Sequence, residues 1–310
     1  MNAPVKIDIS ASHKENLGCS KIAQALNLSR WGTAYQLWEQ YTGRAPWPDI
    51  GNELRVALGE PMEAVLKPFV EQRLGRELRR DRREYRHPTL KLVGHVDYRA
   101  SALNGELRPV VDMKTSLGWG SHVRFGDDET DEVDEDILLQ MQGYTLLTTA
   151  RIAYVAALVP GPGLKIFTME ADDELHSLIE EGVEYFWRCV QTDTPPDLTT
   201  LEDAARRWPY HQSGKTLSAD GLALDTVDEL RALNNEIKRL SADADRLKLA
   251  LQTTMQDAET LVGFDGKPVC TWKTQTAKRF DAKRLQDDQP EIYQYYLKPT
   301  ESRVFRLKGK

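Results

Sequence analysis

LKLVGHVDYRASALNGELRPVVDMKTS, which spans Leu90–Ser116, predicts two paired strands at the centre of the fold. Its two apolar runs, Leu90–Tyr98 and Val110–Met113, flank the dipeptide Asn104-Gly105. This dipeptide favours a hairpin turn because both of its residues tolerate positive φ angles. We therefore expect the two runs to form neighbouring antiparallel strands.

Each run ends in an acid set among apolar residues, Asp97 in the first and Asp112 in the second. Lys114 follows Asp112 at a spacing of two, and the alternation of side chains along a strand places both on one face. Two carboxylates and an ammonium group are costly to bury unless they serve a purpose. A divalent metal ion held by the acids, with the lysine near a substrate phosphate, is such a purpose.

The composition is typical of an ordinary globular chain, with 29% charged and 40% hydrophobic residues among 310. No apolar run approaches the length of a membrane span, and the N-terminal sequence MNAPVKIDIS has no signal-peptide pattern. Cys19, Cys189 and Cys270 form no CxxC pair. This cysteine usage fits a reducing cytoplasm and argues against a zinc site or a disulfide framework.

The net charge of −7 is unevenly distributed along the chain. The segment Asp127–Asp136, DDETDEVDED, holds eight acids in ten residues, so the rest of the chain is close to neutral. By contrast, Arg73–Arg86 holds seven arginines, and the tail after Lys278 is also basic. Segregated charge of this kind favours a local surface for DNA despite the negative total.

Helical patterns precede the central strands. Asn16–Leu28 predicts a turn and a short helix that Ser20 caps, and Arg30–Tyr41 predicts an aromatic-rich amphipathic helix. The apolar spacing of Asn52–Leu78 predicts a long helix or a pair of helices, with a new helix opening at Pro61. Glu63 would then lie in the first turn of that helix.

A helix and a second strand pair follow the acidic segment. Ile137–Thr149 predicts a helix on which Gln140 and Tyr144, four residues apart, share a face. Ile152–Val159 and Leu164–Met169 predict a hairpin. A helix capped by Asp172 comes next. This order of elements indicates an α/β or α+β sheet flanked by helices.

The C-terminal third has a different pattern. Residues 195–226 predict a polar link, and Leu230–Leu251 has apolar residues at alternating spacings of three and four, which is typical of a coiled-coil seam. Such a helix either pairs with another chain or packs back on its own. Gly263–Lys273 predicts a short hairpin around Asp265-Gly266, and the basic, aromatic tail YQYYLKPTESRVFRLKGK ends the chain.

Five short motifs occur in a characteristic order. They are Leu17-Gly18-Cys19-Ser20, Gly59-Glu60-Pro61-Met62-Glu63, Gly94-His95-Val96-Asp97, Asp112-Met113-Lys114 and Gln140-Met141-Gln142-Gly143-Tyr144. This order resembles the PD-(D/E)XK nuclease superfamily, and within it the YqaJ-like viral recombinases related to lambda exonuclease. The similarity covers Ser12 to about Asp197.

The resemblance implies the architecture in more detail. Residues 1–215 would form a nuclease domain with a restriction-endonuclease-like α/β (α+β) core, in which helices flank a central mixed β-sheet. Residues 216–310 would form a C-terminal extension, made of a coiled-coil-like helix, a small β-hairpin and the basic tail.

The resemblance also implies a metal site. Asp97 and Asp112 would bind Mg²⁺, for which Mn²⁺ would substitute, in a site for two ions, assisted by the Met113 backbone carbonyl. Glu63 would bind through a water molecule. Oxygen ligands without a Cys/His cluster favour these ions over zinc. Asp112 stands where the family also uses glutamate, so its reach is one methylene shorter.

Three residues would carry the catalysis. The resemblance implies that Lys114 orients or deprotonates the attacking water and stabilises the pentavalent phosphate. Gln140 would position Lys114 and the substrate strand, and Glu63 would support the metal. Charge stabilisation of this kind is the largest contribution in such hydrolysis.

The residues that the resemblance places at DNA are Ser20, His13, Lys14, Arg30 and Tyr144. The family has an arginine that binds the 5′-phosphate seven residues before Ser20, and this chain has His13 there, with Lys14 beside it. The 5′-phosphate requirement and the polarity of digestion depend on this position.

The acidic segment Asp127–Asp136 is an unusual insertion between Lys114 and Gln140. Its composition predicts a solvated, disordered loop. Two alternatives are that it repels DNA from part of the site or that it contacts a partner.

The function that the resemblance implies is an Mg²⁺-dependent deoxyribonuclease that digests double-stranded DNA 5′→3′. It would leave 3′ single strands for a RecT-type annealing protein in phage recombination. The resemblance also implies a homo-oligomer, a trimeric ring, encoded by a phage or prophage and working in the bacterial cytoplasm without a membrane partner. One alternative is a structure-specific or nicking endonuclease, which His13 suggests; another is an inactive DNA-end-binding scaffold that dimerises through Leu230–Leu251.

Overall fold

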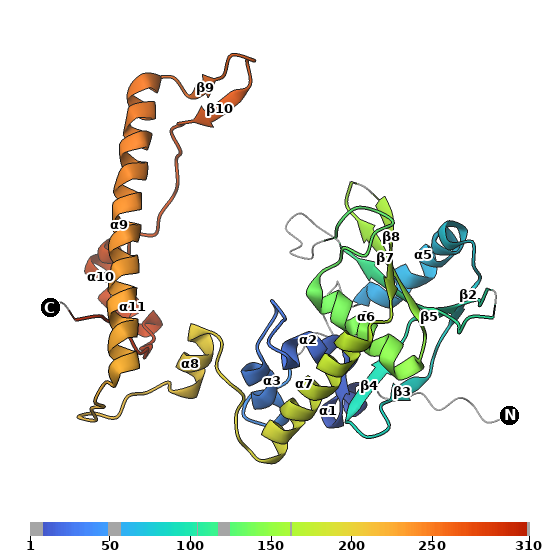
Figure 1. Ribbon diagram of the computed structural model, residues 1–310. Coiled ribbons are helices and arrows are strands. Elements are labelled where there is room, and N and C mark those ends of the chain that lie inside the picture. Colours follow the sequence, from blue (N-terminus) through green and yellow to red (C-terminus); the bar gives the residue numbers. More distant parts are fainter. Residues whose placement is uncertain (1–8, 49–56, 104, 117–124, 162, 309–310) are drawn as a thin grey trace. The chain divides into compact units, whose positions relative to one another are not determined.

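The computed structural model describes residues 9–48, 57–103, 105–116, 125–161 and 163–308 (Figure 1). The chain divides into two compact units, residues 1–207 and residues 208–310. We call them unit 1 and unit 2. No helix among the described residues is both long and apolar enough to cross a membrane.

A five-stranded mixed sheet forms the centre of unit 1. Its order is β2 (Leu78–Arg80), β5 (Tyr98–Ala100), β6 (Val110–Thr115), β7 (Ile152–Val159) and β8 (Gly163–Glu170). Strands β6 and β7 run parallel, whereas the other neighbours are antiparallel. The β6–β7 connection therefore needs a crossover, and helix α6 (Glu135–Thr148) lies in it.

The predicted strand pair is confirmed, with one difference. Strands β5 and β6 are antiparallel, with Tyr98 opposite Val111, while Asn104 of the predicted turn lies outside the described residues. The run Leu90–Tyr98 is not one strand, however. Its first half, β4 (Leu92–His95), belongs to a separate three-stranded sheet, and only its end enters β5.

That smaller sheet has the order β1-β4-β3. Strand β4 pairs in parallel with β1 (Leu17–Gly18) and antiparallel with β3 (Glu84–Arg86). The chain thus passes from one sheet to the other at Val96 and Asp97. A period-2 apolar pattern cannot reveal this break, because the side chains remain buried on both sides of it.

Helices cover both faces of the five-stranded sheet. Helix α5 (Gly59–Leu74) packs Leu66 and Val70 on one face, against Val111 and Met113 of β6. Helices α6 and α7 (Asp173–Gln191) pack on the other face, in a larger core. The expected α/β fold, a central mixed sheet flanked by helices, is therefore confirmed.

Several predicted helix ends are found where they were expected. Pro61 lies in the first turn of α5, and Asp172 caps α7 by accepting hydrogen bonds from the amides of Glu174 and Leu175. Gln140 and Tyr144 share helix α6. Each of these ends depends on local chemistry that the sequence displays directly.

The N-terminal helices differ from the prediction in detail. Ser20 caps no helix, because it lies inside the 3₁₀ turn η1 (Cys19–Lys21), and the following helix α2 (Ile22–Ala25) has no side-chain cap. Helix α3 (Ala34–Tyr41) begins four residues later than expected. Thr33 caps it in a capping box with Gln36. A short helix α1 (Ile9–Glu15) precedes all of these.

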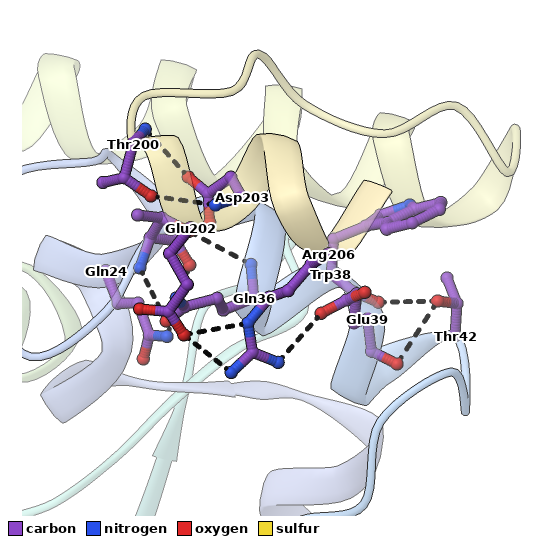
Figure 2. Close-up of polar contacts among 10 residues, drawn as sticks. Gln24, Gln36, Trp38, Glu39, Thr42, Thr200, Glu202, Asp203 and Arg206 are labelled. Atoms are coloured by element: carbon purple, nitrogen blue, oxygen red, sulfur yellow. Dashed lines mark hydrogen bonds and ion pairs between the residues drawn. The ribbon is translucent and has the colours of Figure 1, made fainter. Parts of the chain in front are cut away.

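The region predicted as a polar link contains a docked helix, α8 (Leu201–Arg207). Its anchor is Asp203, which is fully buried and accepts hydrogen bonds from the Thr33 hydroxyl at 2.8 Å and from the Thr199 and Thr200 amides. Figure 2 shows the contact between Asp203 and Thr200. Arg206 adds ion pairs with Glu202, 2.9 Å away, and with Glu39 of α3. The last helix of unit 1 is thus attached to the loop before α3.

The acidic segment is ordered, so the prediction of a disordered loop is wrong. The Glu129 amide donates to the Ile166 carbonyl and the Thr168 amide to the Thr130 carbonyl, which extends the pairing at the β8 edge. Asp128 accepts from the Ile166 amide at 2.7 Å and pairs with Arg73 at 2.7 Å. An edge strand with unpaired backbone groups supplied partners that composition could not reveal.

Unit 2 consists of one long helix and several small elements, and the predicted helix and hairpin are both confirmed. Helix α9 runs from Gly221 to Met255. Strands β9 (Thr260–Val262) and β10 (Pro268–Thr271) pair antiparallel around Asp265-Gly266. Two short helices follow, α10 (Ala282–Asp288) and α11 (Pro290–Tyr296). Most seam residues of α9 are exposed; Ile237, for example, is 61% exposed, whereas Leu230 is partly buried.

Candidate active site

Strand β6 supplies two of the predicted site residues. The alternation of its side chains turns Val111 and Met113 toward α5, whereas Asp112 and Lys114 lie together, as expected for spacing two. The Lys114 Nζ lies 2.6 Å from Oδ2 of Asp112, which is only 2% exposed. This ion pair is the centre of the candidate site.

Asp97 lies beside this pair because the chain crosses between the two sheets at this residue. Its Oδ2 accepts a hydrogen bond from the Met113 amide at 3.0 Å, which ties it to β6. Its backbone carbonyl accepts from the Asp81 amide at 3.0 Å, in the loop between β2 and β3. Asp97 is thus held by its side chain and by its backbone.

Helix α6 supplies a chain of hydrogen bonds that ends on the lysine. Lys114 Nζ donates to Gln140 Oε1 at 3.1 Å, and Gln140 Nε2 donates to the Tyr144 hydroxyl at 2.8 Å. Gln140 and Tyr144 are 9% and 6% exposed. Because the oxygen and the nitrogen of the Gln140 amide each make one of these contacts, the side chain has a single orientation. This orientation also fixes the position of Lys114.

Glu63, the fifth residue of α5, approaches the same group. Its Oε2 lies 3.7 Å from an Arg80 guanidinium nitrogen, and its side chain is 16% exposed. Its negative charge acts on Asp97, Lys114 and Tyr98. The structure therefore brings together all the predicted catalytic and metal-binding side chains, from α5, the sheet junction, β6 and α6.

The electrostatics show how crowded the acids are. Burial, followed by the charges of Asp112 and Glu63, raises the pKa of Asp97 well above its usual range. Burial acts to lower the pKa of Lys114, but the charges of Asp112 and Asp97 outweigh it, so this pKa is raised. Lys114 lies among three carboxylates, of which Glu63 also has Arg80 nearby, so acids still outnumber cations at the site.

The residues fit a divalent metal ion with oxygen ligands. Oδ2 of Asp112 is buried and, within the described residues, has its ion pair with Lys114 but no hydrogen bond of standard geometry. No cluster of three or more His, Cys, Asp or Glu side chains suitable for a metal occurs in the described part of the chain. Magnesium needs no such cluster, because it retains several waters and uses one or two protein carboxylates. Asp97 and Asp112 are two carboxylates that could fill this role.

The predicted DNA-contacting residues have different surroundings. Ser20 and Lys14 are exposed on η1 and α1. Arg30 forms an ion pair with the buried Asp134 at the start of α6. Tyr144 is buried, and its hydroxyl accepts a hydrogen bond from Gln140, so it does not lie at an open surface. His13 is half-buried.

The surroundings of His13 are those of a packed side chain. Its ring meets the His95 ring edge to face, with centroids 5.4 Å apart, and its Nε2 lies 2.9 Å from where a Cβ on Gly18 would stand. Burial and the neighbouring His95 lower the pKa of His13. A neutral imidazole in this position cannot replace the fixed charge of an arginine.

The sequence analysis did not identify Asp81, whose backbone amide donates to the Asp97 carbonyl. Asp81 accepts hydrogen bonds from the Tyr85 hydroxyl at 2.6 Å and from the Arg83 guanidinium at 2.7 Å. Burial opposes this, yet the Arg83 and Tyr85 contacts lower the pKa of Asp81 to about 2. The only signal in the sequence is an acid between two arginine pairs, Arg79-Arg80 and Arg82-Arg83.

Comparison with known proteins gives a family over the same region. Residues 10–151 match the model for the YqaJ-like viral recombinase domain. An uncharacterized protein YqaJ from Bacillus subtilis (strain 168) is 27% identical over 303 residues, which cover 95% of this chain and 92% of that protein.

Similar solved structures include an alkaline exonuclease from Laribacter hongkongensis, with a TM-score of 0.46 and 13% identity over 59% of this chain and 92% of that one. A phage-related exonuclease from Haemophilus somnus 129PT has a TM-score of 0.43 and 14% identity, over 59% of this chain and 99% of that one. The family match includes Glu63, Asp97, Asp112, Lys114 and Gln140. This match covers slightly less than half of the chain and shows a similarity to the YqaJ-like viral recombinase domain.

Proposed function

We propose that this protein is a divalent-metal-dependent deoxyribonuclease that digests double-stranded DNA from its ends, 5′→3′, and leaves 3′ single strands. The observation that carries the proposal is the meeting of Asp97, Asp112 and Lys114 with Glu63 and Gln140 at one end of strand β6. Acids that crowd one lysine form a site for a cation and a phosphate rather than a structural ion pair.

Asp97, Asp112 and the Met113 carbonyl would hold Mg²⁺, in a site for up to two ions, with Glu63 attached through a water molecule. When bound, the metal would supply Lewis acidity and positive charge at the scissile phosphate. Hydrolysis adds a water oxygen to the phosphorus while a P–O ester bond breaks. The protein's own residues must position that water and stabilise the added negative charge.

Lys114 would perform both tasks. Its ion pair with Asp112 and its hydrogen bond to Gln140 hold the ammonium in its charged form at the site. A charged lysine stabilises the pentavalent phosphate, which favours this role over that of a general base. Gln140, fixed by Tyr144, would aim the lysine and contact the substrate strand.

DNA would reach the site past Ser20, Lys14 and Arg30. Because Arg30 is paired with Asp134, a DNA phosphate would have to compete with this carboxylate for the guanidinium. Residues 1–215 would form the nuclease domain, and residues 216–310 an extension. A homo-oligomeric ring, a RecT-type annealing partner and a phage or prophage origin belong to the same proposal.

The test is digestion of end-labelled linear duplex DNA with Mg²⁺. Lys114→Ala should reduce the rate by about 10²–10³-fold, the usual effect of removing one stabilising group from a transition state. Lys91→Ala is the matched control, since Lys91 is exposed and lies over the Trp187 ring, away from the site. Equal rates for Lys114→Ala and the wild type would refute the mechanism.

A structure-specific or nicking endonuclease is the second candidate, and the packing of His13 favours it. A half-buried imidazole that packs on His95 offers no fixed charge for a terminal 5′-phosphate. Covalently closed circular DNA separates the two activities. An end-dependent exonuclease leaves the circle intact, whereas an endonuclease converts it to nicked or linear DNA.

A further inference from the structure

The last part of unit 2 differs sharply in charge from the rest of that unit. Residues 208–266 contain six Lys and Arg residues and ten Asp and Glu residues, whereas residues 267–310 contain eleven and five. We call residues 267–310 the basic aromatic segment. Its charge has no role in the proposed active site.

The same segment exposes an unusual number of aromatic rings. Trp272 is 48% exposed and Phe280 77% exposed, although rings of this size normally contribute to a core. The other exposed aromatic residues of the segment are Tyr295, Tyr296 and Phe305. These rings alternate along the chain with Lys and Arg residues, so apolar faces and positive charges are interleaved.

Many of these cations are available for a ligand. Lys278, Arg279 and Lys283 have no ion pair within the described residues of the chain. By contrast, the cations on α9 are largely neutralised within the helix; Arg239, for example, pairs with both Glu236 and Asp243. Within the segment Lys267, Lys273 and Arg284 do form ion pairs. The uncompensated charge of the described segment therefore includes Lys278, Arg279 and Lys283, next to Phe280.

The segment is extended along unit 2 rather than folded into a compact patch. It begins at the hairpin, where the Trp272 amide donates to the Glu259 carbonyl just beyond the end of α9. It ends near the first half of α9, where Arg231 donates to the Lys308 carbonyl at 2.9 Å. Arg231 and Met255 are about 36 Å apart at the rise of an α-helix, so the segment covers this distance.

This combination fits one chemical class of ligand. Single-stranded nucleic acid presents phosphates to cations and unpaired bases to aromatic rings, and stacking does not depend on the base sequence. Duplex DNA would use the cations only, because its bases are stacked on one another. An acidic protein would likewise leave a row of exposed rings such as Tyr295 and Tyr296 without a specific role.

We infer that the basic aromatic segment binds single-stranded DNA, with Trp272 and Phe280 stacking on bases and Lys278 and Arg279 contacting phosphates. The identity of the strand rests on the proposed function, because resection would generate a 3′ single strand beside the enzyme. Unit 2 would hold that strand after it leaves the active site.

The experiment measures the fluorescence anisotropy of a labelled oligothymidine with the full-length chain in EDTA, where hydrolysis cannot occur. Trp272→Ala and Phe280→Ala should each weaken binding about tenfold, the usual effect of losing one stacked base. The double variant Lys278→Gln/Arg279→Gln should reduce the slope of log affinity against log salt by roughly 1.4, for two phosphate contacts on a single strand.

Matched controls come from the same unit. Tyr210→Ala removes a ring that is 70% exposed, and Lys238→Gln removes an exposed cation, both outside the basic aromatic segment. Both should leave oligothymidine binding unchanged. A labelled duplex of the same length is the second probe, and Trp272→Ala should not change its affinity.

Two results would overturn the inference: unchanged oligothymidine binding by Trp272→Ala and Phe280→Ala, or an equal loss on single strand and duplex. Nuclease activity is assayed separately with Mg²⁺. An inactive wild type whose oligothymidine binding still depends on Trp272 would refute the proposed function and support the inference. An active enzyme whose oligothymidine binding does not depend on Trp272 would support the proposed function and refute the inference.

Discussion

Units 1 and 2 are stabilised in different ways. Unit 1 has a large apolar core on one face of its sheet and a second core under α5, with many fully buried side chains such as Trp38 and Phe167. Among the described residues of unit 2, Met255 is the single buried hydrophobic residue. Unit 1 is therefore stabilised by tertiary packing, and unit 2 by interactions that are local in the sequence.

The long helix of unit 2 illustrates local stabilisation. Ion pairs at a spacing of three connect Arg231 with Asp228, Arg239 with Glu236, and Lys248 with Asp245. Solvent screens such exposed pairs, so each one contributes only weakly to the helix. Regular secondary structure alone therefore does not indicate how much a substitution in a region lowers the free energy of unfolding.

The largest difference should come from removing a phenylalanine from each unit. Phe186 is fully buried in unit 1 and packs edge to face with Tyr41, so Phe186→Ala should lower the free energy of unfolding by about 3–5 kcal/mol. Phe305 is 78% exposed in unit 2, and Phe305→Ala should change it by less than about 0.5 kcal/mol. Urea denaturation followed by tryptophan fluorescence measures both; similar losses would mean that unit 2 has a packed core.

An intermediate difference should come from removing an aspartate from each unit. Asp203→Ala should lower the free energy of unfolding by roughly 2–3 kcal/mol, since it leaves the Thr33 hydroxyl and the Thr199 amide without their buried acceptor. Asp243→Ala on α9 removes only exposed ion pairs and should change it by less than about 0.5 kcal/mol.

Hydrogen exchange at Thr199 and Thr200 distinguishes a local from a global effect of the Asp203 change. Faster exchange confined to these amides and to α8 would show that Asp203 attaches the end of unit 1. Asp203→Asn retains an acceptor oxygen and should recover part of the loss. Unchanged exchange in Asp203→Ala would contradict the role of this side chain as an anchor.

The smallest effect should be a pH response that belongs to unit 1. Burial lowers the pKa of His176, although Asp173, Asp172 and Glu180 act to raise it, and its Nε2 is 2.9 Å from the Thr145 hydroxyl. The folded state thus binds this proton less tightly than the unfolded state. Neutral His176 therefore contributes its full stabilisation when the pH is above the ordinary histidine pKa near 6.5. This contribution is lost as the pH falls below that value.

The measurement compares the unfolding free energy of wild type and His176→Gln at several pH values between neutral and mildly acidic. His176→Gln should flatten the decline on acidification, because glutamine keeps a hydrogen-bonding group but does not titrate. An identical decline in the two proteins would assign the pH response to other groups.

Much of the fold follows from local patterns in the sequence. The β5–β6 pair, the β7–β8 hairpin, the Asp172 cap and the long helix α9 all depend on spacing or turn chemistry within a few residues. The meeting of Asp97, Asp112 and Lys114 followed from the same patterns. The role of Lys114 in hydrolysis stays a prediction.

The features that could not be predicted depend on partners distant in the sequence. Asp203 accepts a hydrogen bond from Thr33, which lies 170 residues away in the sequence. This contact anchors a helix where the composition indicated a link. The acidic segment became ordered because the free edge of β8 and the side chain of Arg73 were available to it. Composition describes a segment on its own, whereas these contacts depend on the rest of the fold.

The position of Asp97 at the junction of two sheets has a consequence for ligand binding. Its backbone and its carboxylate are fixed by different parts of the chain, through Asp81 and Met113, before any ligand arrives. The conformational entropy of this side chain is therefore lost during folding rather than on binding. A cation would meet a preorganised ligand, so its affinity would not be reduced by ordering Asp97.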